Sequence, residues 1–247
     1  MIIVGWNIRA GGGRRIEQIA TQLASWRTDI VALSEYRGTP ASVWLAETLA
    51  VQGLTHQATT ASDENPARNG LLVASRWPVT TIPLRKLPTP RHRVMPVRID
   101  APRPISIIAV HGPLGTTGLR RSFNDRLLAK LRRWRYPPGM LIGDTNTGKR
   151  GIDEQSAVFD ARDDAWMGGM NRRWPDAFRH LHGQQREYTW YSPNRGNGFR
   201  LDQAFVHPGL LSRVTGVDYR WGDNGSGRRD ALSDHAAIVV EISDDRA

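Results

Sequence analysis

The chain has 247 residues, enough to bury a full hydrophobic core in one large α/β domain or in two small ones. It contains no cysteine, which excludes disulfides and thiolate zinc sites and fits a reducing compartment. The 34 Lys and Arg against 24 Asp and Glu give a net charge of +10, which attracts polyanions such as nucleic acid, although a solubilising surface explains the same charge.

Ten short apolar runs of strand type alternate with helical patterns along the chain. Met1 leads straight into the first run, residues 1–6, with no basic leader or cleavage site, and no stretch of 18 uncharged apolar residues follows. We therefore expect a cytoplasmic protein without a membrane span. The other predicted strands cover 29–36, 70–75, 94–99, 105–112, 139–144, 187–192, 201–207, 214–221 and 236–242.

Helical spacing of apolar residues is found at 14–27 and 119–135, and a weaker helix is predicted over 41–52. Residues 145–186 have the composition of an insertion made of loops and short helices. No linker or internal repeat divides the chain, so we expect one domain over residues 1–247 and a monomer. Because ten strands exceed one comfortable sheet, the pattern favours two mostly antiparallel sheets packed face to face with helices outside.

Polar residues recur where the predicted strands begin or end. All of them carry oxygen or imidazole groups: Asn7, Glu35, His111, Asp144, Asn146, Asp202, Asp234 and His235. Each has an ordinary structural explanation when taken alone, as a turn former, a strand-end cap or a buried histidine with a partner. Groups of one chemical kind placed repeatedly at strand ends are what a site on the rim of a sheet requires. We therefore predict a functional site at that rim.

Eight ordered motifs resemble those of the endonuclease/exonuclease/phosphatase superfamily. They are GWN (5–7), LSE (33–35), GLLVASRWP (70–78), AVHGP (109–113), GDTN (143–146), TW (189–190), RLDQAFV (200–206) and SDH (233–235). The superfamily includes pancreatic-type deoxyribonucleases, abasic-site endonucleases, sphingomyelinases, inositol-polyphosphate 5-phosphatases and a toxin subunit that nicks DNA. The resemblance implies a four-layer α/β sandwich, with two sheets between helical layers, and metal-dependent hydrolysis of phosphoesters.

The resemblance also implies a role for each catalytic residue. His235 would be the general base that activates water, and Asp202 would hold its ring in the required tautomer. His111 would hydrogen-bond the phosphate or assist the leaving group. Asp144 and Asn146 would orient water and a phosphoryl oxygen, or share a second metal position, and both roles stay open.

Magnesium is the expected cofactor, with manganese as a substitute. Mg²⁺ prefers hard oxygen ligands and retains bound waters, and the chain offers no thiolate. Glu35, assisted by Asn7 and Asp234, is the predicted metal cage. With Asp234 facing the metal and His235 facing the nucleophile, the adjacent carboxylate and imidazole of the SDH motif would have separate tasks.

Two departures from the family pattern indicate which branch of the superfamily the chain resembles. His111 stands where abasic-site endonucleases have Asn with a nearby Tyr, which favours the deoxyribonuclease, sphingomyelinase and phosphatase branches over abasic-site repair. Asn69 stands where pancreatic-type enzymes place a Glu that supports the first histidine, so we expect His111 to lack a carboxylate partner. Among the tryptophans, we place Trp190 near the site.

A nuclease acting on DNA or RNA is the favoured interpretation. The predicted contacts to nucleic acid are arginines of the 119–135 segment and of the RLD motif: Arg120, Arg121, Arg132, Arg133 and Arg200. A solvated basic face is the alternative for the helix. A phosphomonoesterase or a lipid or inositol phosphoesterase would use the same catalytic residues. A catalytically silent nucleic-acid-binding member is disfavoured because every catalytic position is intact.

Overall fold

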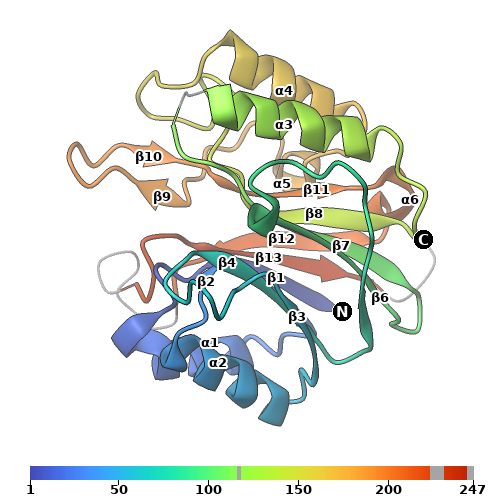
Figure 1. Cartoon of the computed structure of the whole chain (residues 1–247). Coiled ribbons are helices and arrows are strands. Elements are labelled where there is room, and N and C mark those ends of the chain that lie inside the picture. Colours follow the sequence, from blue (N-terminus) through green and yellow to red (C-terminus); the bar gives the residue numbers. More distant parts are fainter. Residues whose placement is uncertain (116–117, 223–230, 244–247) are drawn as a thin grey trace.

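Two β-sheets pack face to face, and helices cover the outer side of each (Figure 1). The computed structural model describes residues 1–115, 118–222 and 231–243. The first sheet has six strands, in the order β12 (Val214–Arg220), β13 (Ala237–Ile242), β1 (Ile2–Asn7), β2 (Ile30–Tyr36), β4 (Gly70–Ser75) and β3 (His56–Thr59). The second has five, in the order β11 (Asp202–Val206), β8 (Gly139–Asp144), β7 (Ile105–His111), β6 (Val94–Ile99) and β5 (Val79–Thr81). A short ribbon of β9 (Trp190–Tyr191) and β10 (Gly198–Phe199) extends to one side (Figure 1).

Strand directions bring many strand ends to one edge of the sandwich. Strand β1 is parallel to β2, and β7 is parallel to β8. The other described pairs in both sheets are antiparallel. Because β13 runs opposite to β1 and β11 runs opposite to β8, the first residues of β13 and β11 lie beside the last residues of β1 and β8.

Helices form the two outer layers (Figure 1). The first sheet is covered by α1 (Ile16–Ser25) and α2 (Pro40–Val51), and the second by α3 (Gly118–Leu131) and α4 (Ala161–Asn171). Two shorter helices are α5 (Ala177–His182) and α6 (Pro208–Leu211). Helix α4 begins with a capping box, in which the Asp160 side chain accepts from Asp163 N and Asp160 N donates to the Asp163 side chain. Pro40, the first residue of α2, likewise favours the start of its helix.

The main core lies between the sheets. It contains the inward-facing residues of both, such as Ile3, Val73, Ile107 and Ile142, all with no exposed surface. The sheets approach closely at Gly5 of β1, where a β-carbon would lie 2.6 Å from Cγ1 of Ile142 in β8. Only glycine allows this approach without displacing the facing side chain.

The architecture confirms the predicted pair of mostly antiparallel sheets between helical layers. The strands predicted at 70–75, 94–99 and 139–144 have the predicted bounds. The helix predicted over 119–135 ends earlier, at Leu131, because the chain turns there: Arg133 N donates to Lys130 O and Trp134 N to Leu131 O. Two prolines, at 137 and 138, then prevent continuation of the helix.

Three strands were not predicted, and one is much shorter than predicted. Strand β3 is the polar edge sequence HQAT, β5 has three residues and β10 has two, so none carries a strong apolar alternation. The strand predicted over 187–192 shortens to the two residues of β9. None of the described helices combines the length and the apolar character that crossing a bilayer would need.

Candidate active site

The predicted polar residues meet at the edge where the two sheets share their strand ends. Asn7 ends β1, His111 ends β7 and Asp144 ends β8, while Asp202 begins β11. One hydrogen bond joins the two sheets at this edge: Asn7 Nδ2 donates to Asp144 Oδ2 at 3.1 Å. The same amide group lies 3.4 Å from Glu35 Oε1. Residues from distant parts of the sequence therefore form one cluster.

Two of these residues have backbone conformations that L-amino acids seldom adopt. Glu35 has φ of 57° and lies at a register shift between β2 and β4, and Asn146 has φ of 49°. Such conformations cost about 1–3 kcal/mol each and persist where the surrounding structure imposes them. The Glu35 carboxylate is held by Ala10 N, which donates to Oε2 at 2.7 Å. The irregularity in β2 therefore turns the Glu35 side chain toward the edge.

Asp144 is at the centre of the cluster. Its Oδ1 accepts from Asn146 N at 2.9 Å, and its Oδ2 lies 3.7 Å from His111 Nε2 and 3.8 Å from His235 Nε2. Burial raises the pKa of Asp144 to about 7; the charge of His235 opposes the shift and that of Asp202 adds to it. Burial thus disfavours the ionised form of Asp144, and a nearby positive charge would stabilise it.

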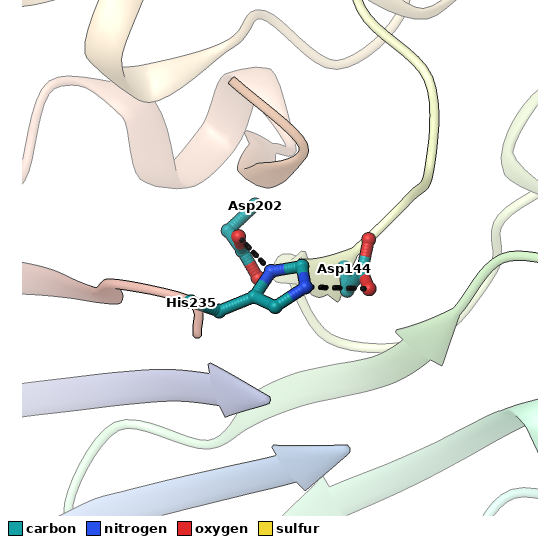
Figure 2. Close-up of side chains that lie close together, drawn as sticks. All are labelled: Asp144, Asp202 and His235. Carbon is teal, nitrogen blue, oxygen red and sulfur yellow. Dashed lines mark hydrogen bonds and ion pairs between the residues drawn. The ribbon is translucent and has the colours of Figure 1, made fainter. Parts of the chain in front are cut away.

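His235 is held between two carboxylates (Figure 2). Its Nδ1 lies 2.8 Å from Asp202 Oδ2, and its Nε2 faces Asp144. Thr189 fixes the start of β11, because Thr189 Oγ1 accepts from Asp202 N at 3.1 Å. Burial acts against a charge on His235, but Asp202 and Asp144 outweigh it and raise the pKa of His235 to about 10. Trp190 makes a β-bridge with His235, which places that tryptophan beside the site as predicted.

His111 differs in its electrostatic environment. Its ring is buried, and Nε2 lies 3.9 Å from Glu35 Oε1 as well as close to Asp144. Burial and the nearby charge of Arg93 lower the pKa of His111 well below its usual value. Nδ1 has no hydrogen-bond partner among the described residues, and Asn69 instead accepts from Arg37 Nε at 2.6 Å. The expectation that His111 lacks a carboxylate partner therefore holds only for Nδ1 within the described residues, because Asp144 and Glu35 both face Nε2.

The oxygen-rich part of the cluster fits a divalent cation. Asn7 and Glu35, two of the predicted metal ligands, lie side by side. Asp144, Asp202 and His235 each offer an atom within 4.8 Å of the others, and the buried Asp202 Oδ1 has no hydrogen-bond partner in the part of the chain that the structure describes. Uncompensated carboxylate oxygens of this kind suit Mg²⁺ or Mn²⁺.

Asp234 lies at the outer margin of the cluster. Its side chain is 41% exposed, and Oδ2 lies 3.9 Å from Arg9 Nε. The neighbouring Ser233 Oγ donates to Asn7 O at 2.5 Å, which ties the SDH segment to the end of β1. Asp234 thus follows a residue that is bonded to Asn7, and its own carboxylate faces a basic side chain.

Two of the five arginines predicted to contact nucleic acid are buried, and for these the prediction is wrong. Arg200 is fully buried, and its guanidinium donates to Asp153 at 2.8 Å and to Asp176 at 2.5 Å. Arg120 is 5% exposed and donates to both carboxylate oxygens of Asp163. Sequence spacing cannot distinguish an exposed arginine from one that folds back onto an acidic partner of a distant segment.

The other three arginines reach the surface. Arg121 is paired with Asp160 at 2.8 Å and keeps 36% of its side chain exposed. Arg132 and Arg133 are exposed in the turn that follows α3. These three remain available to a polyanion, and their role stays a prediction.

One basic residue of the site was not predicted. Arg93, immediately before β6, donates from Nη1 to Gly112 O at 3.2 Å and to His111 O at 3.4 Å. Its half-buried guanidinium lies close enough to Asp144 and Glu35 for both carboxylates to act on its pKa, which burial lowers. The signal in the sequence was the basic run Arg91–Arg93 directly before an apolar strand.

Comparisons with known proteins agree on the fold. The family model described as Endonuclease/Exonuclease/phosphatase family matches residues 4–235. No curated protein gives a sequence match. The chain is similar to an AP endonuclease from Archaeoglobus fulgidus, with a TM-score of 0.81 and 19% identity over 98% of this chain and 99% of that one. It is also similar to the 3′ phosphatase NExo from Neisseria bound to a product DNA hairpin, with a TM-score of 0.79 and 20% identity over 98% and 99%. A third similar structure is the 3′-5′ exonuclease NExo from Neisseria meningitidis, with a TM-score of 0.77 and 20% identity over 98% and 100%.

Proposed function

Because the chain belongs to the Endonuclease/Exonuclease/phosphatase family, whose members hydrolyse phosphoesters, we propose that it is a divalent-cation-dependent phosphodiesterase that cleaves nucleic acid. The observation that carries this proposal is the buried row of Asp202, His235 and Asp144 at the shared edge of the two sheets. The net charge of +10 supports a polyanionic substrate.

The chain's own groups suit in-line attack by water on a phosphodiester. Asp202 at Nδ1 fixes the tautomer of His235, so that the deprotonated Nε2, which faces Asp144, can accept a proton from a water bound at this edge. His111, kept neutral by burial, can hydrogen-bond a phosphoryl or leaving oxygen. Arg93 adds a fixed positive charge next to the same edge.

Glu35 and Asp144 would hold the cation, which we propose is Mg²⁺ with Mn²⁺ as a substitute, while Asn7 Nδ2 donates to both carboxylates and orients them. When bound, the cation would stabilise charge on the phosphoryl oxygens and, by opposing the nearby carboxylates, lower the pKa of His235 toward the neutral range. Asn146 donates from Nδ2 to Gly112 O at 2.8 Å, so its side chain is oriented before substrate binds. If Asp144 and Asn146 share a second cation, two ions bind per chain instead of one.

Removal of divalent cations should abolish hydrolysis. We expect excess chelator to reduce cleavage of plasmid DNA or bis(p-nitrophenyl) phosphate to background, and added Mg²⁺ or Mn²⁺ to restore it, because the acidic cluster needs a cation to stabilise the developing charge. Isothermal titration of chelated protein with Mn²⁺ measures the number of ions independently of activity. Full turnover in excess chelator would contradict the mechanism.

A second candidate is removal of a phosphate from a nucleic-acid 3′ end. It is favoured by the likeness to the 3′ phosphatase NExo over 98% of this chain. A panel of single-stranded DNA with a 3′ hydroxyl, the same strand with a 3′ phosphate, duplex with an abasic site, plasmid and RNA separates the two candidates. The nuclease proposal expects shortened or nicked products, and the phosphatase expects release of inorganic phosphate with the strand intact.

A further inference from the structure

The basic residues of α3 fall into two groups with different surroundings. Arg120 and Arg121, in the first turns, pair with two aspartates at the start of α4. Arg126 and Lys130, further along the helix, have no carboxylate partner within the described parts of the chain. The positive charge that remains uncompensated is therefore confined to the second half of α3.

A hollow of about 590 Å³ opens beside this half of the helix. It lies between α3 and the segment that leads into β6, and four cations line it: Lys86, Arg91, Arg126 and Lys130. None of the four pairs with a carboxylate of the residues that the structure describes. Four like charges around one concave surface attract phosphate groups strongly.

A second hollow, of about 370 Å³, continues from the first and shares Ala129 and Lys130 with it. It runs past the end of α3 to Trp134 and Tyr136. The Tyr136 side chain is 39% exposed, and its ring centroid lies 5.2 Å from that of Trp134. Trp134 is itself fixed, because its Nε1 donates to Pro137 O at 3.1 Å. The second hollow therefore ends in a supported, exposed aromatic ring.

One short turn of the chain links the first hollow to the active site. Arg91 lines the hollow and begins the short helical turn Arg91–Arg93. Arg93 donates to Gly112 O, the same carbonyl oxygen that accepts from Asn146 Nδ2. Basic groups are thus found both at the catalytic edge, in Arg93, and along the two hollows.

We propose that these two hollows, the α3 groove, bind a single strand of nucleic acid that leads away from the catalytic edge. The proposal rests on the proposed function, and it adds a binding site outside the catalytic cluster. Backbone phosphates would lie against Lys86, Arg126 and Lys130, and an unpaired base would stack on Tyr136. A basic groove combined with an exposed aromatic ring is the general means of binding single strands without sequence preference. A duplex keeps its bases stacked inside and leaves no base face for Tyr136.

Fluorescence anisotropy with fluorescein-labelled oligo(dT) in chelator tests the groove without cleavage. We expect wild type to bind a strand of about 20 nucleotides far more tightly than one of about five, since only the longer strand spans both hollows. The double variant Arg126→Glu with Lys130→Glu should weaken binding of the long strand by about tenfold or more and reduce its salt dependence. Tyr136→Ala should weaken it by about fivefold or more, whereas Tyr136→Phe, which keeps the ring, should stay within about twofold.

Arg172→Glu with Arg173→Glu provides the matched control. These two arginines are exposed just after α4 and line neither hollow, and their replacement reverses the same number of charges. A loss in this control as large as in the groove variant would overturn the proposal, because general attraction would then explain the binding. Equal affinity for a duplex of the same length, with no effect of Tyr136→Ala, would overturn the single-strand assignment.

The proposed function is tested separately. Hydrolysis of bis(p-nitrophenyl) phosphate by wild type with Mg²⁺ requires the catalytic cluster and is too small a substrate to reach the α3 groove. If wild type did not hydrolyse this substrate, the proposed phosphodiesterase function would be contradicted. Loss of long-strand binding confined to the groove variants would still establish the groove as a binding site.

Discussion

Replacing His235 with Gln should lower the rate of phosphodiester hydrolysis by about a hundredfold or more. Glutamine can still donate a hydrogen bond toward Asp202, whose Oδ2 lies 2.8 Å from His235 Nδ1, but it cannot accept a proton from water near neutral pH. Loss of a positioned general base costs about two to four orders of magnitude in rate. Initial rates with saturating Mg²⁺ on bis(p-nitrophenyl) phosphate and on DNA measure the effect.

The control for this variant is His56→Gln. His56 is an exposed residue of the edge strand β3, outside the cluster, so its replacement should leave the rate within about twofold. Binding of Mn²⁺ to His235→Gln should persist, because the oxygen donors remain. If His235→Gln retained the wild-type rate, another group would have to accept the proton.

Replacing Asp153 with Asn should lower the free energy of unfolding by about 3–5 kcal/mol. Asp153 is fully buried and accepts from Arg200 Nε at 2.8 Å, from Lys149 N at 2.7 Å and from the guanidinium of Arg179. The amide keeps the shape of the carboxylate but not its charge, so it leaves buried positive charge poorly compensated. Urea unfolding followed by tryptophan fluorescence measures the change. The matched control is Asp125→Asn, whose 68% exposed side chain lies 4.0 Å from Arg162 and should contribute about 0.5 kcal/mol or less.

The pH dependence of this difference has a definite sign. Burial favours the neutral acid, but Arg200 and the other donors outweigh it and hold the pKa of Asp153 below its usual value. A depressed carboxyl pKa contributes stability above the unfolded pKa of about 4, and the contribution is lost as the pH falls through the folded value. The difference in the free energy of unfolding between wild type and Asp153→Asn should therefore be constant near neutrality and decrease below about pH 4. A gap that widened in acid would contradict the assignment of the charge to Asp153.

Periodicity and motif order were sufficient to predict the two sheets, their helical layers and most of the polar residues that meet at the shared edge. Strands such as Gly70–Ser75 are continuous apolar runs, and buried runs of this kind have few alternatives. Polar edge strands such as His56–Thr59 carry no such signal, because pairing with β4 rather than sequence pattern creates them.

The partners of arginines could not be predicted, because they are set by tertiary contacts. Arg200 belongs to a motif near the catalytic residues, yet its guanidinium points into the protein toward Asp153 and Asp176, which precede it by 47 and 24 residues. Arg93 was missed for the converse reason: it sits in a plain basic run, and only packing brings it to His111 and Gly112. Spacing along the chain identifies residue types at strand ends but not the direction of long side chains.

The close approach at Gly5 couples the thickness of the central core to the geometry of the candidate active site. Gly5 lies two residues before Asn7 on β1, and Ile142 lies two residues before Asp144 on β8. The contact between Gly5 and Ile142 therefore sets the spacing of the two strands just before the hydrogen bond from Asn7 to Asp144. A single added methyl group at Gly5 would wedge β1 and β8 apart and lengthen the Asn7–Asp144 separation without altering any polar group. Substitutions at apolar interior positions can therefore alter the spacing of the polar cluster without changing any of its members.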